Sequence, residues 1–299
     1  MIKRTLYFGN PAYLKTANEQ LVIEMPDTGE IKQAPIEDIG LLMLDHQQVT
    51  ITHALLSKLL ANNVAVITCD HTHHPTGLFL NLDGHTLQSQ KFQAQVEASV
   101  PLKKQLWQQT VIAKILNQAA LLQREKADHK ILLNHAKEVK SGDSENHEAK
   151  AAAYYWKNLL PEFLNFTRER FGAPPNNLLN YGYAILRAVV ARSLVGSGLL
   201  PTLGIFHRNQ YNAYCLADDV MEPYRPFVDK VVCSIVAMNG QYLEMTPDMK
   251  KQLLGIPAID VRINGQKSPL MNAVQRTTAS LTKCFEGSSR KIVYPEFAD

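Results

Sequence analysis

The first 80 residues carry short runs of apolar residues that are typical of β-strands. Four such runs are separated by turn signals such as Gly-Asn-Pro and Pro-Asp-Thr-Gly, and they span Arg4–Phe8, Gln20–Met25, Ile36–Leu44 and Val64–Cys69. Between the last two runs, the four leucines from Leu55 to Leu60 lie on one helical face and predict a helix over about residues 52–62. We therefore expect a small β-rich domain over residues 1–85.

The period of the pattern becomes helical near residue 97. Residues 81–96 are polar and form the expected crossover, and from about Ala98 apolar residues recur at helical spacing to about Arg124. The stretch from Asn177 to about Val195 is apolar nearly all round, which is typical of a helix buried in the centre of a domain. Two further helices are expected over residues 230–254 and 270–285. The pattern predicts an α+β protein whose larger second domain, residues 95–299, is all-α.

The distribution of charge and of cysteines restricts the possible classes of function only a little. The net charge is +3, but residues 1–100 hold 6 Lys and Arg against 10 Asp and Glu, and the remainder holds 25 against 18. This asymmetry favours contact of a polyanion with the second part, although ordinary charge scatter would explain it equally well. The four cysteines form no CxxC pair, and no apolar run is long enough to cross a bilayer. We expect a cytoplasmic protein that makes no membrane contact.

Residues 198–229 contain the side chains that are most informative about a possible functional site. A loop with two glycines and a proline leads to His207, and a helical pattern then runs from Ala213 to Glu222, which directly precedes Pro223. Asp219 and Glu222 lie three residues apart, so their carboxylates share one helical face. Two carboxylates near a histidine indicate a site for a hard metal ion.

Two other stretches carry polar residues that could act at such a site. Glu148 would lie in the first turn of an alanine-rich helix, with Asn146 as the expected N-cap. Taken alone, a glutamate at that position is most often a capping device. Asn180 and Arg187 share a face of the central helix. They either form hydrogen bonds within the core or border an active site, where Arg187 would meet a phosphate or brace a metal-binding carboxylate.

These stretches resemble a known family. Gly-Leu-Leu-Pro-Thr-Leu-Gly-Ile-Phe-His is followed by Leu-Ala-Asp-Asp-Val-Met-Glu-Pro-Tyr-Arg-Pro-Phe-Val-Asp, while Glu-Ala-Lys-Ala-Ala-Ala-Tyr-Tyr and Leu-Asn-Tyr-Gly-Tyr-Ala-Ile-Leu-Arg occur upstream. Together they resemble Cas1, the CRISPR-associated endonuclease and integrase of spacer acquisition, and the length suggests a type II version. The resemblance covers nearly the whole chain.

The resemblance implies roles for individual residues. It reverses the capping interpretation of Glu148 and implies that Glu148, His207 and Glu222 are catalytic and hold one Mg²⁺ or Mn²⁺. Asp219 would be an occasional ligand or would orient His207. The expected nucleic-acid-binding residues are Asn180, Arg187, Arg208 and Arg225.

The resemblance also implies a reaction and partners. The expected activity is insertion of short DNA fragments into a CRISPR array by attack of a 3′-OH on a phosphodiester. Expected partners are double-stranded DNA with 3′-OH ends, CRISPR repeat DNA, a second copy of the chain bound through the N-terminal domain, and Cas2 in a hetero-hexamer.

Four other classes of function compete with this interpretation. The residues alone are also compatible with a metal-dependent nuclease that does not integrate DNA and with a non-catalytic nucleic-acid scaffold whose acids only cap helices. A zinc hydrolase is disfavoured because no HExxH motif occurs, and a non-haem iron oxygenase because no second histidine is suitably placed.

Overall fold

The N-terminal part of the protein is built from two four-stranded sheets. The computed structural model describes residues 3–160, 163, 166–238 and 243–297. The first sheet has the order β1-β5-β7-β8, with strands Arg4–Phe8, Ile39–Leu44, Ala65–Cys69 and Pro75–Phe79. The second has the order β4-β3-β2-β6, with strands Ile31–Pro35, Gln20–Glu24, Ala12–Ala17 and Val49–Ile51. Helix α1 (His53–Ala61) begins after Thr52, whose hydroxyl accepts the backbone N–H of Leu55.

Strand β5 is buried on both faces, which explains its continuous apolar sequence. It lies between the parallel strands β1 and β7. Leu42 packs into the core shared by the two sheets and α1, whereas Leu41 and Met43 pack into the core of the helical part. Successive side chains of a strand point to opposite faces, so one strand contributes to both cores. The first sheet is therefore the layer on which the helices rest.

A buried carboxylate at the end of β5 links the sheets to the helices. Asp45 accepts a hydrogen bond from the hydroxyl of Tyr7 and lies 2.7 Å from the ammonium of Lys250 in helix α9 (Pro247–Leu254). Nδ1 of His73, in the turn between β7 and β8, is 2.9 Å from Asp45. Burial alone would raise the pKa of Asp45, but these three partners lower it, so the carboxylate stays ionised.

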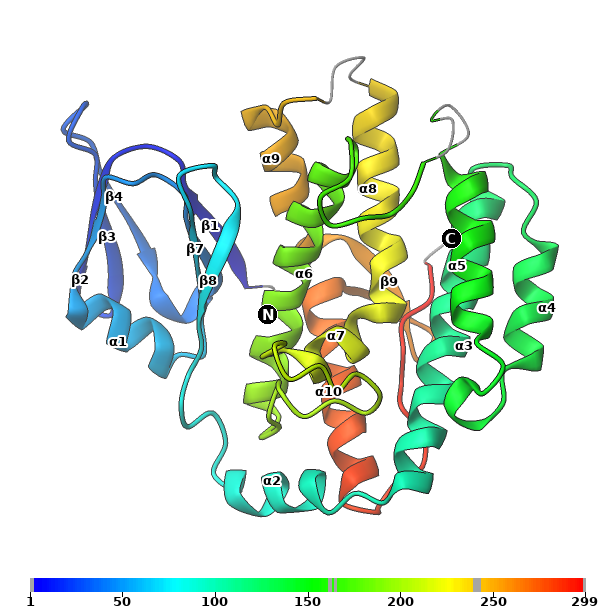
Figure 1. The fold of residues 1–299 in the computed structure, drawn as a ribbon. Helices are drawn as coiled ribbons and strands as arrows, with labels where there is room; N and C mark the ends of the chain where they lie inside the picture. The colour runs from blue at the N-terminus through cyan, green and yellow to red at the C-terminus, as the bar shows by residue number, and fades with distance from the viewer. Residues whose placement is uncertain (1–2, 161–162, 164–165, 239–242, 298–299) are drawn as a thin grey trace.

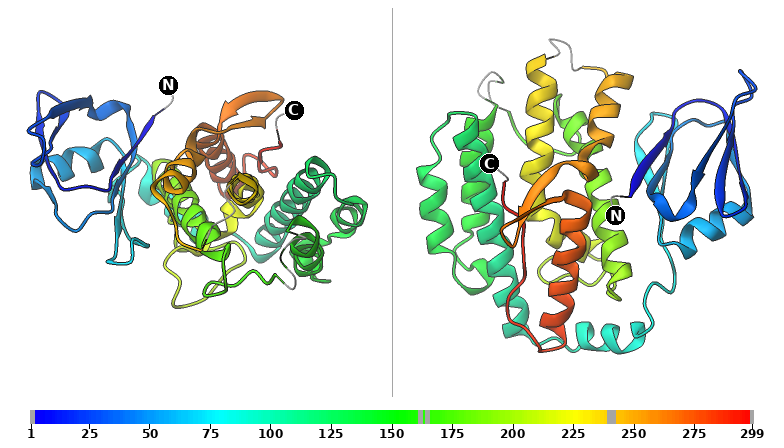
Figure 2. Two further views of the ribbon diagram at one scale, coloured as in Figure 1. Left: turned by 90° about the horizontal axis from the view of Figure 1, so that it is seen from above. Right: turned by 180° about the vertical axis from the view of Figure 1, so that it is seen from behind.

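The remainder of the chain is mainly helical. Figure 1 shows α6 between the sheets on one side and α3, α4 and α5 on the other, and Figure 2 shows the same arrangement from above and from behind. The helices are α2 (Gln88–Val96), α3 (Val100–Arg124), α4 (Lys130–Glu138), α5 (His147–Leu159), α6 (Asn176–Gly196), α7 (Cys215–Met221), α8 (Arg225–Met238), α9 (Pro247–Leu254) and α10 (Leu270–Phe285). Short 3₁₀ helices span Ile36–Asp38, Ser141–Asp143, Glu222–Tyr224 and Ile256–Ala258.

The α+β class and the buried central helix are confirmed, with three corrections of detail. The crossover predicted over residues 81–96 contains α2. The single helix predicted over residues 230–254 is two helices, α8 and α9, and residues 239–242 between them lie outside the described residues. The strand predicted from Ile36 begins at Ile39, after a 3₁₀ turn. No described helix is both long and apolar enough to span a membrane.

The second part is not all-α, because it contains a β-hairpin. Strands β9 (Asp260–Ile263) and β10 (Gln266–Pro269) pair in antiparallel fashion. The turn residues Asn264 and Gly265 both have positive φ, 51° and 72°. Asn-Gly between two alternating runs is a strong hairpin signal, since a type I′ turn needs two such residues. The prediction of an all-α region overlooked this local signal.

Candidate metal and nucleic-acid site

Two carboxylates from distant parts of the chain meet at one lysine ammonium group. Glu148 lies in the first turn of α5 and Glu222 begins the 3₁₀ helix after α7. The ammonium of Lys114, from α3, is 2.7 Å from Oε1 of Glu148 and 2.6 Å from Oε2 of Glu222. The fold thus brings the two predicted acids, Glu148 and Glu222, close together around a positively charged group.

The helix that carries Glu148 is capped by a residue other than the predicted one. Asn146 has a left-handed backbone with φ of 55°, and its side chain makes no capping hydrogen bond. The carboxylate of Asp143 instead accepts the backbone N–H groups of His147 at 2.9 Å and of Glu148 at 3.0 Å. Asn146 therefore stands at the predicted N-cap position, but the side chain that accepts the helical N–H groups is that of Asp143 in the preceding turn.

Replacing Asp143 by alanine should loosen the start of α5. We expect a loss of about 1 to 2 kcal/mol in the free energy of unfolding, because two helical N–H groups lose their acceptor. Urea unfolding of the variant would measure this loss. Ser144→Ala, at an exposed neighbouring position, is the matched control. Equal stability of the two variants would contradict the assignment of Asp143 as the cap.

His207 is held in place from two sides. The fully buried Asp219 accepts the backbone N–H groups of Ile205 at 2.6 Å and Phe206 at 2.9 Å, and its Oδ1 lies 2.5 Å from Nδ1 of His207. Phe206 stacks on Trp107 of α3 with ring centroids 4.3 Å apart. With Nδ1 directed at Asp219, the Nε2 atom of His207 keeps its lone pair for a ligand.

The electrostatics of the site keep Glu222 ionised and favour a cation. Burial alone would raise the pKa of Glu222, but Arg225 and Lys114 outweigh it and lower the pKa to about 2. The pKa of Lys114 is raised, since the charges of Glu222 and Glu148 outweigh its burial. The hydrogen bond to Asp219 raises the pKa of His207 against the effect of burial, and the charges of Glu222 and Glu148 act in the same direction.

These residues fit a Mg²⁺ or Mn²⁺ ion. Two carboxylates face a single cation that lies between them, and an imidazole with one free nitrogen is electrostatically coupled to both. Oxygen-rich donor sets suit Mg²⁺ and Mn²⁺, and one imidazole nitrogen favours Mn²⁺ slightly. The ammonium of Lys114 provides part of the positive charge that a bound metal ion would supply.

The four predicted nucleic-acid-binding residues are not in equivalent surroundings. Arg187 donates from Nε and Nη2 to Asp218 at 2.7 and 3.1 Å, and the guanidinium of Arg225 is 2.9 Å from Glu222. The Asn180 carboxamide accepts a hydrogen bond from Arg168 at 2.7 Å. Arg208, by contrast, is exposed beside His207.

A basic cleft borders this cluster. It has a volume of about 1020 Å³ and lies between the turn joining β7 to β8 and the face of α6. Five of its lining residues are cationic side chains: Arg168, Arg170, Arg187, Arg225 and Lys250. Arg225 lines the cleft and also contacts Glu222, so this side chain links the cleft to the acidic site.

Three residues that line the cleft or contact the two carboxylates were not predicted from the sequence. Arg168 and Arg170 come from a loop-rich stretch that carries no helical or strand pattern. Lys114 did leave a signal, since it lies seven residues after the buried Trp107 and three after Val111 on the inward face of α3. A lysine on such a face needs a buried acidic partner.

Another buried acid contacts Tyr183, one of the residues that line the cleft. Asp229 of α8 accepts hydrogen bonds from the hydroxyls of Tyr155, at 2.7 Å, and Tyr183. Burial raises its pKa to about 6, although the two hydroxyls act in the opposite direction. Stability contributed by such a group is fully present below the unfolded pKa near 4 and is lost as pH rises through about 6.

Asp229→Asn should therefore change the pH dependence of stability. Between pH 4 and 7 the wild-type protein should lose on the order of 2 kcal/mol of unfolding free energy relative to the variant, because only the wild type must bury a new charge. Urea unfolding of both proteins across this range would measure the difference. Parallel pH profiles would show that Asp229 does not titrate there.

The fold is shared with proteins whose structures have been solved. A casposase bound to integration product aligns with a TM-score of 0.78 at 19% sequence identity, covering 98% of this chain and 92% of that one. A CAS1 protein from Thermotoga maritima aligns with a TM-score of 0.75 at 16% identity, covering 95% and 97%. The α+β arrangement described above is thus the Cas1 fold.

Sequence comparison then identifies the family. The family model described as CRISPR associated protein Cas1 matches residues 6–244. A CRISPR-associated endonuclease Cas1 from Neisseria meningitidis serogroup C is 38% identical over 282 residues, covering 94% of this chain and 91% of the relative. One from Saccharolobus solfataricus is 30% identical over 232 residues, covering 73% and 70%. The chain belongs to the Cas1 family, which confirms the resemblance seen in its motifs.

Proposed function

We propose that the protein is a metal-dependent DNA endonuclease and integrase that inserts short DNA fragments into a CRISPR array of type II. The observation that carries this proposal is the convergence of Glu148 and Glu222 on one ammonium group, next to a histidine fixed by Asp219, in a chain of the Cas1 family. A non-catalytic scaffold would have no need for two acids facing each other in the interior.

In this proposal Glu148, Glu222 and Nε2 of His207 hold Mg²⁺ or Mn²⁺. The bound ion would activate a water or a DNA 3′-OH and polarise the phosphate that is attacked. Asp219 keeps the His207 ring in one orientation through a 2.5 Å contact. Arg225 and Lys114 keep Glu222 ionised while the site is assembled. Hydrolysis and strand transfer would share this site, because they differ only in the attacking oxygen.

We propose that DNA lies along the basic cleft. Arg187 and the exposed Arg208 would contact phosphates, supported by Arg168 and Arg170 in the cleft wall. Asn180 would act by holding Arg168, and Arg225 would act at the point where cleft and carboxylates meet.

The partners of the protein also belong to this proposal. One solved structure that shares the fold is a Cas6-RT-Cas1–Cas2 complex, with a TM-score of 0.75, 20% identity, and coverage of 97% of this chain and 35% of that one. We propose a homodimer formed through residues 1–85 that joins Cas2 and repeat DNA in the cytoplasm, with residues 95–299 as the catalytic domain.

An integration assay tests the activity. The protein is combined with its Cas2 partner, Mn²⁺, a labelled short duplex with free 3′-OH ends and a supercoiled plasmid carrying a repeat. The proposal expects relaxed plasmid that carries the label, and no product with a chelator. A nuclease without integrase activity would nick the plasmid and attach no label to it, whether the 3′-OH ends are free or blocked. For an integrase, blocking the 3′-OH ends should abolish the labelling of the plasmid. A scaffold would give neither product.

Affinity for DNA should fall steeply with salt. Contacts between arginines and phosphates release counterions, so Arg208→Gln should weaken binding roughly fivefold and reduce the salt slope by about one. Lys32→Gln, at an exposed position of β4, is the control and should change neither quantity. Fluorescence anisotropy with a short duplex would measure both. An affinity that is flat between about 50 and 200 mM salt would contradict this proposal.

A further inference from the structure

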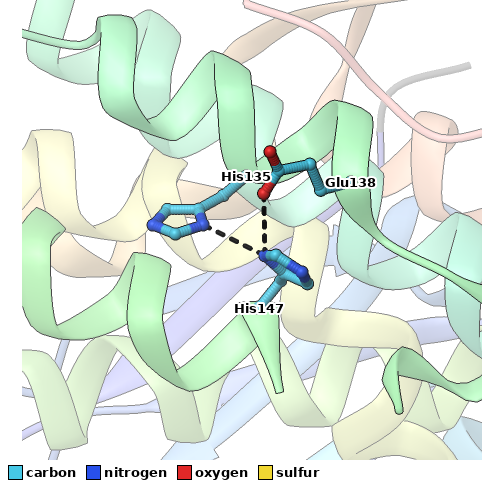
Figure 3. Close-up of side chains that lie close together, drawn as sticks. All are labelled: His135, Glu138 and His147. Atoms are coloured by element: carbon cyan, nitrogen blue, oxygen red, sulfur yellow. Dashed lines mark hydrogen bonds and ion pairs between the residues drawn. The ribbon is translucent and has the colours of Figure 1, made fainter. Parts of the chain in front are cut away.

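A second cluster of metal-binding side chains lies outside the site described above. His135 and Glu138 belong to the last turn of α4, and His147 is the first residue of α5. Nδ1 of His135 is 3.0 Å from Nδ1 of His147, which in turn is 3.9 Å from Oε2 of Glu138. Figure 3 shows the three side chains directed toward one another across the junction of the two helices.

The spacing of these atoms is close to that around a tetrahedral ion. Metal–ligand bonds of the zinc type place neighbouring ligand atoms about 3.3 to 3.5 Å apart. The two observed separations, 3.0 and 3.9 Å, lie on either side of that value. One candidate ligand atom from each side chain lies within 4.8 Å of the others. An ion could therefore replace the contact between the two rings after small shifts of the side chains.

The surroundings of His147 prepare its Nδ1 atom for such a role. Its other ring nitrogen, Nε2, lies 3.4 Å from a carboxylate oxygen of Glu145, which favours a proton on Nε2 and a lone pair on Nδ1. The side chain is only 4% exposed, and the backbone N–H is held by Asp143. The ring is thus fixed by groups other than the ligands, as is usual for histidines that bind metal.

The cluster is open on one side. A cavity of about 630 Å³ lies beside it, lined by Glu138 and Glu145 together with Gln108 and Lys140. This space would admit an ion and a water molecule as fourth ligand. Glu138 is well exposed and can close on the ion from the cavity side.

We propose that His135, Glu138 and His147 bind a divalent transition-metal ion of the zinc class. Two imidazoles and one carboxylate favour Zn²⁺ over Mg²⁺, in contrast to the oxygen-rich set of Glu148 and Glu222. The ion would tie the end of α4 to the start of α5, next to Glu148. Its role would be to stabilise this junction, and the proposal does not depend on the proposed DNA chemistry.

Cobalt titration of the full-length protein tests the proposal. Co²⁺ in a four-coordinate nitrogen and oxygen site absorbs visible light, whereas the hydrated ion scarcely does. The His207→Asn background removes the imidazole of the other site. We expect one equivalent of Co²⁺ to bind with visible absorption, and Zn²⁺ to displace it. His135→Asn and Glu138→Gln should each weaken this binding at least about tenfold.

Controls keep the outcome clear. His129→Asn, a half-buried histidine at the start of α4, should leave the titration unchanged. Replacing the buried His147 would disturb folding, so the test rests on His135 and Glu138, with circular dichroism to verify that each variant is folded. Zn²⁺ should also raise the unfolding temperature of the parent protein but not of the His135→Asn variant. Absence of saturable Co²⁺ absorption, or equal binding by the folded His135→Asn variant, would overturn the proposal.

Discussion

The His207→Asn protein should lose at least about a thousandfold in the rate of strand transfer and of metal-dependent cleavage, which corresponds to about 4 kcal/mol of transition-state stabilisation. The proposed site has one nitrogen ligand, and its orientation depends on the contact between His207 and Asp219. Removing the imidazole should therefore disable both reactions together. The rate of appearance of labelled, relaxed plasmid measures strand transfer, and nicking of unlabelled plasmid measures cleavage.

Two further measurements make this result specific. Gln210→Ala, at an exposed position of the same loop, should retain the wild-type rates. The affinity of the His207→Asn protein for DNA should stay within about twofold of wild type, since phosphate contacts dominate binding. Integration by this variant at near wild-type rate would place the active site elsewhere in the chain.

Lys114→Met should make the stability of the protein depend on divalent metal. In the wild-type protein the ammonium lies between two carboxylates with little access to solvent. Without it, Glu148 and Glu222 repel each other, and Arg225 compensates for this repulsion only in part. Removing one partner of a buried ion pair costs about 3 to 5 kcal/mol, so we expect a loss of this size in the presence of a chelator.

Addition of Mn²⁺ should restore most of that loss. The ion would supply the missing positive charge and would no longer compete with Lys114 for the same oxygens. Urea unfolding with chelator and with Mn²⁺ would measure both effects, and Lys104→Met, at an exposed position of α3, is the matched control. If Mn²⁺ stabilised the wild type and the Lys114→Met variant equally, the carboxylates would not form the metal site.

Local sequence patterns predicted much of the fold correctly. Short apolar runs in the first 80 residues identified four of the eight strands described there, and the apolar stretch from Asn177 identified the buried helix α6. These predictions succeeded because periodicity reports which side chains of one element face a core. The missed hairpin at Asn264 and Gly265 was also a local signal, and it was readable from the chain.

Which charged groups pair was decided by tertiary structure. The sequence placed Asp218 and Asp219 side by side, but only packing directs the first toward Arg187 and the second toward His207. The contacts of Lys114 with both acids join three separate elements, and no periodicity encodes that meeting. A pattern within one segment reports local burial. The partner of a buried charge depends on which distant segment packs against it, because a buried ion pair needs close contact between two side chains that can lie far apart in the sequence.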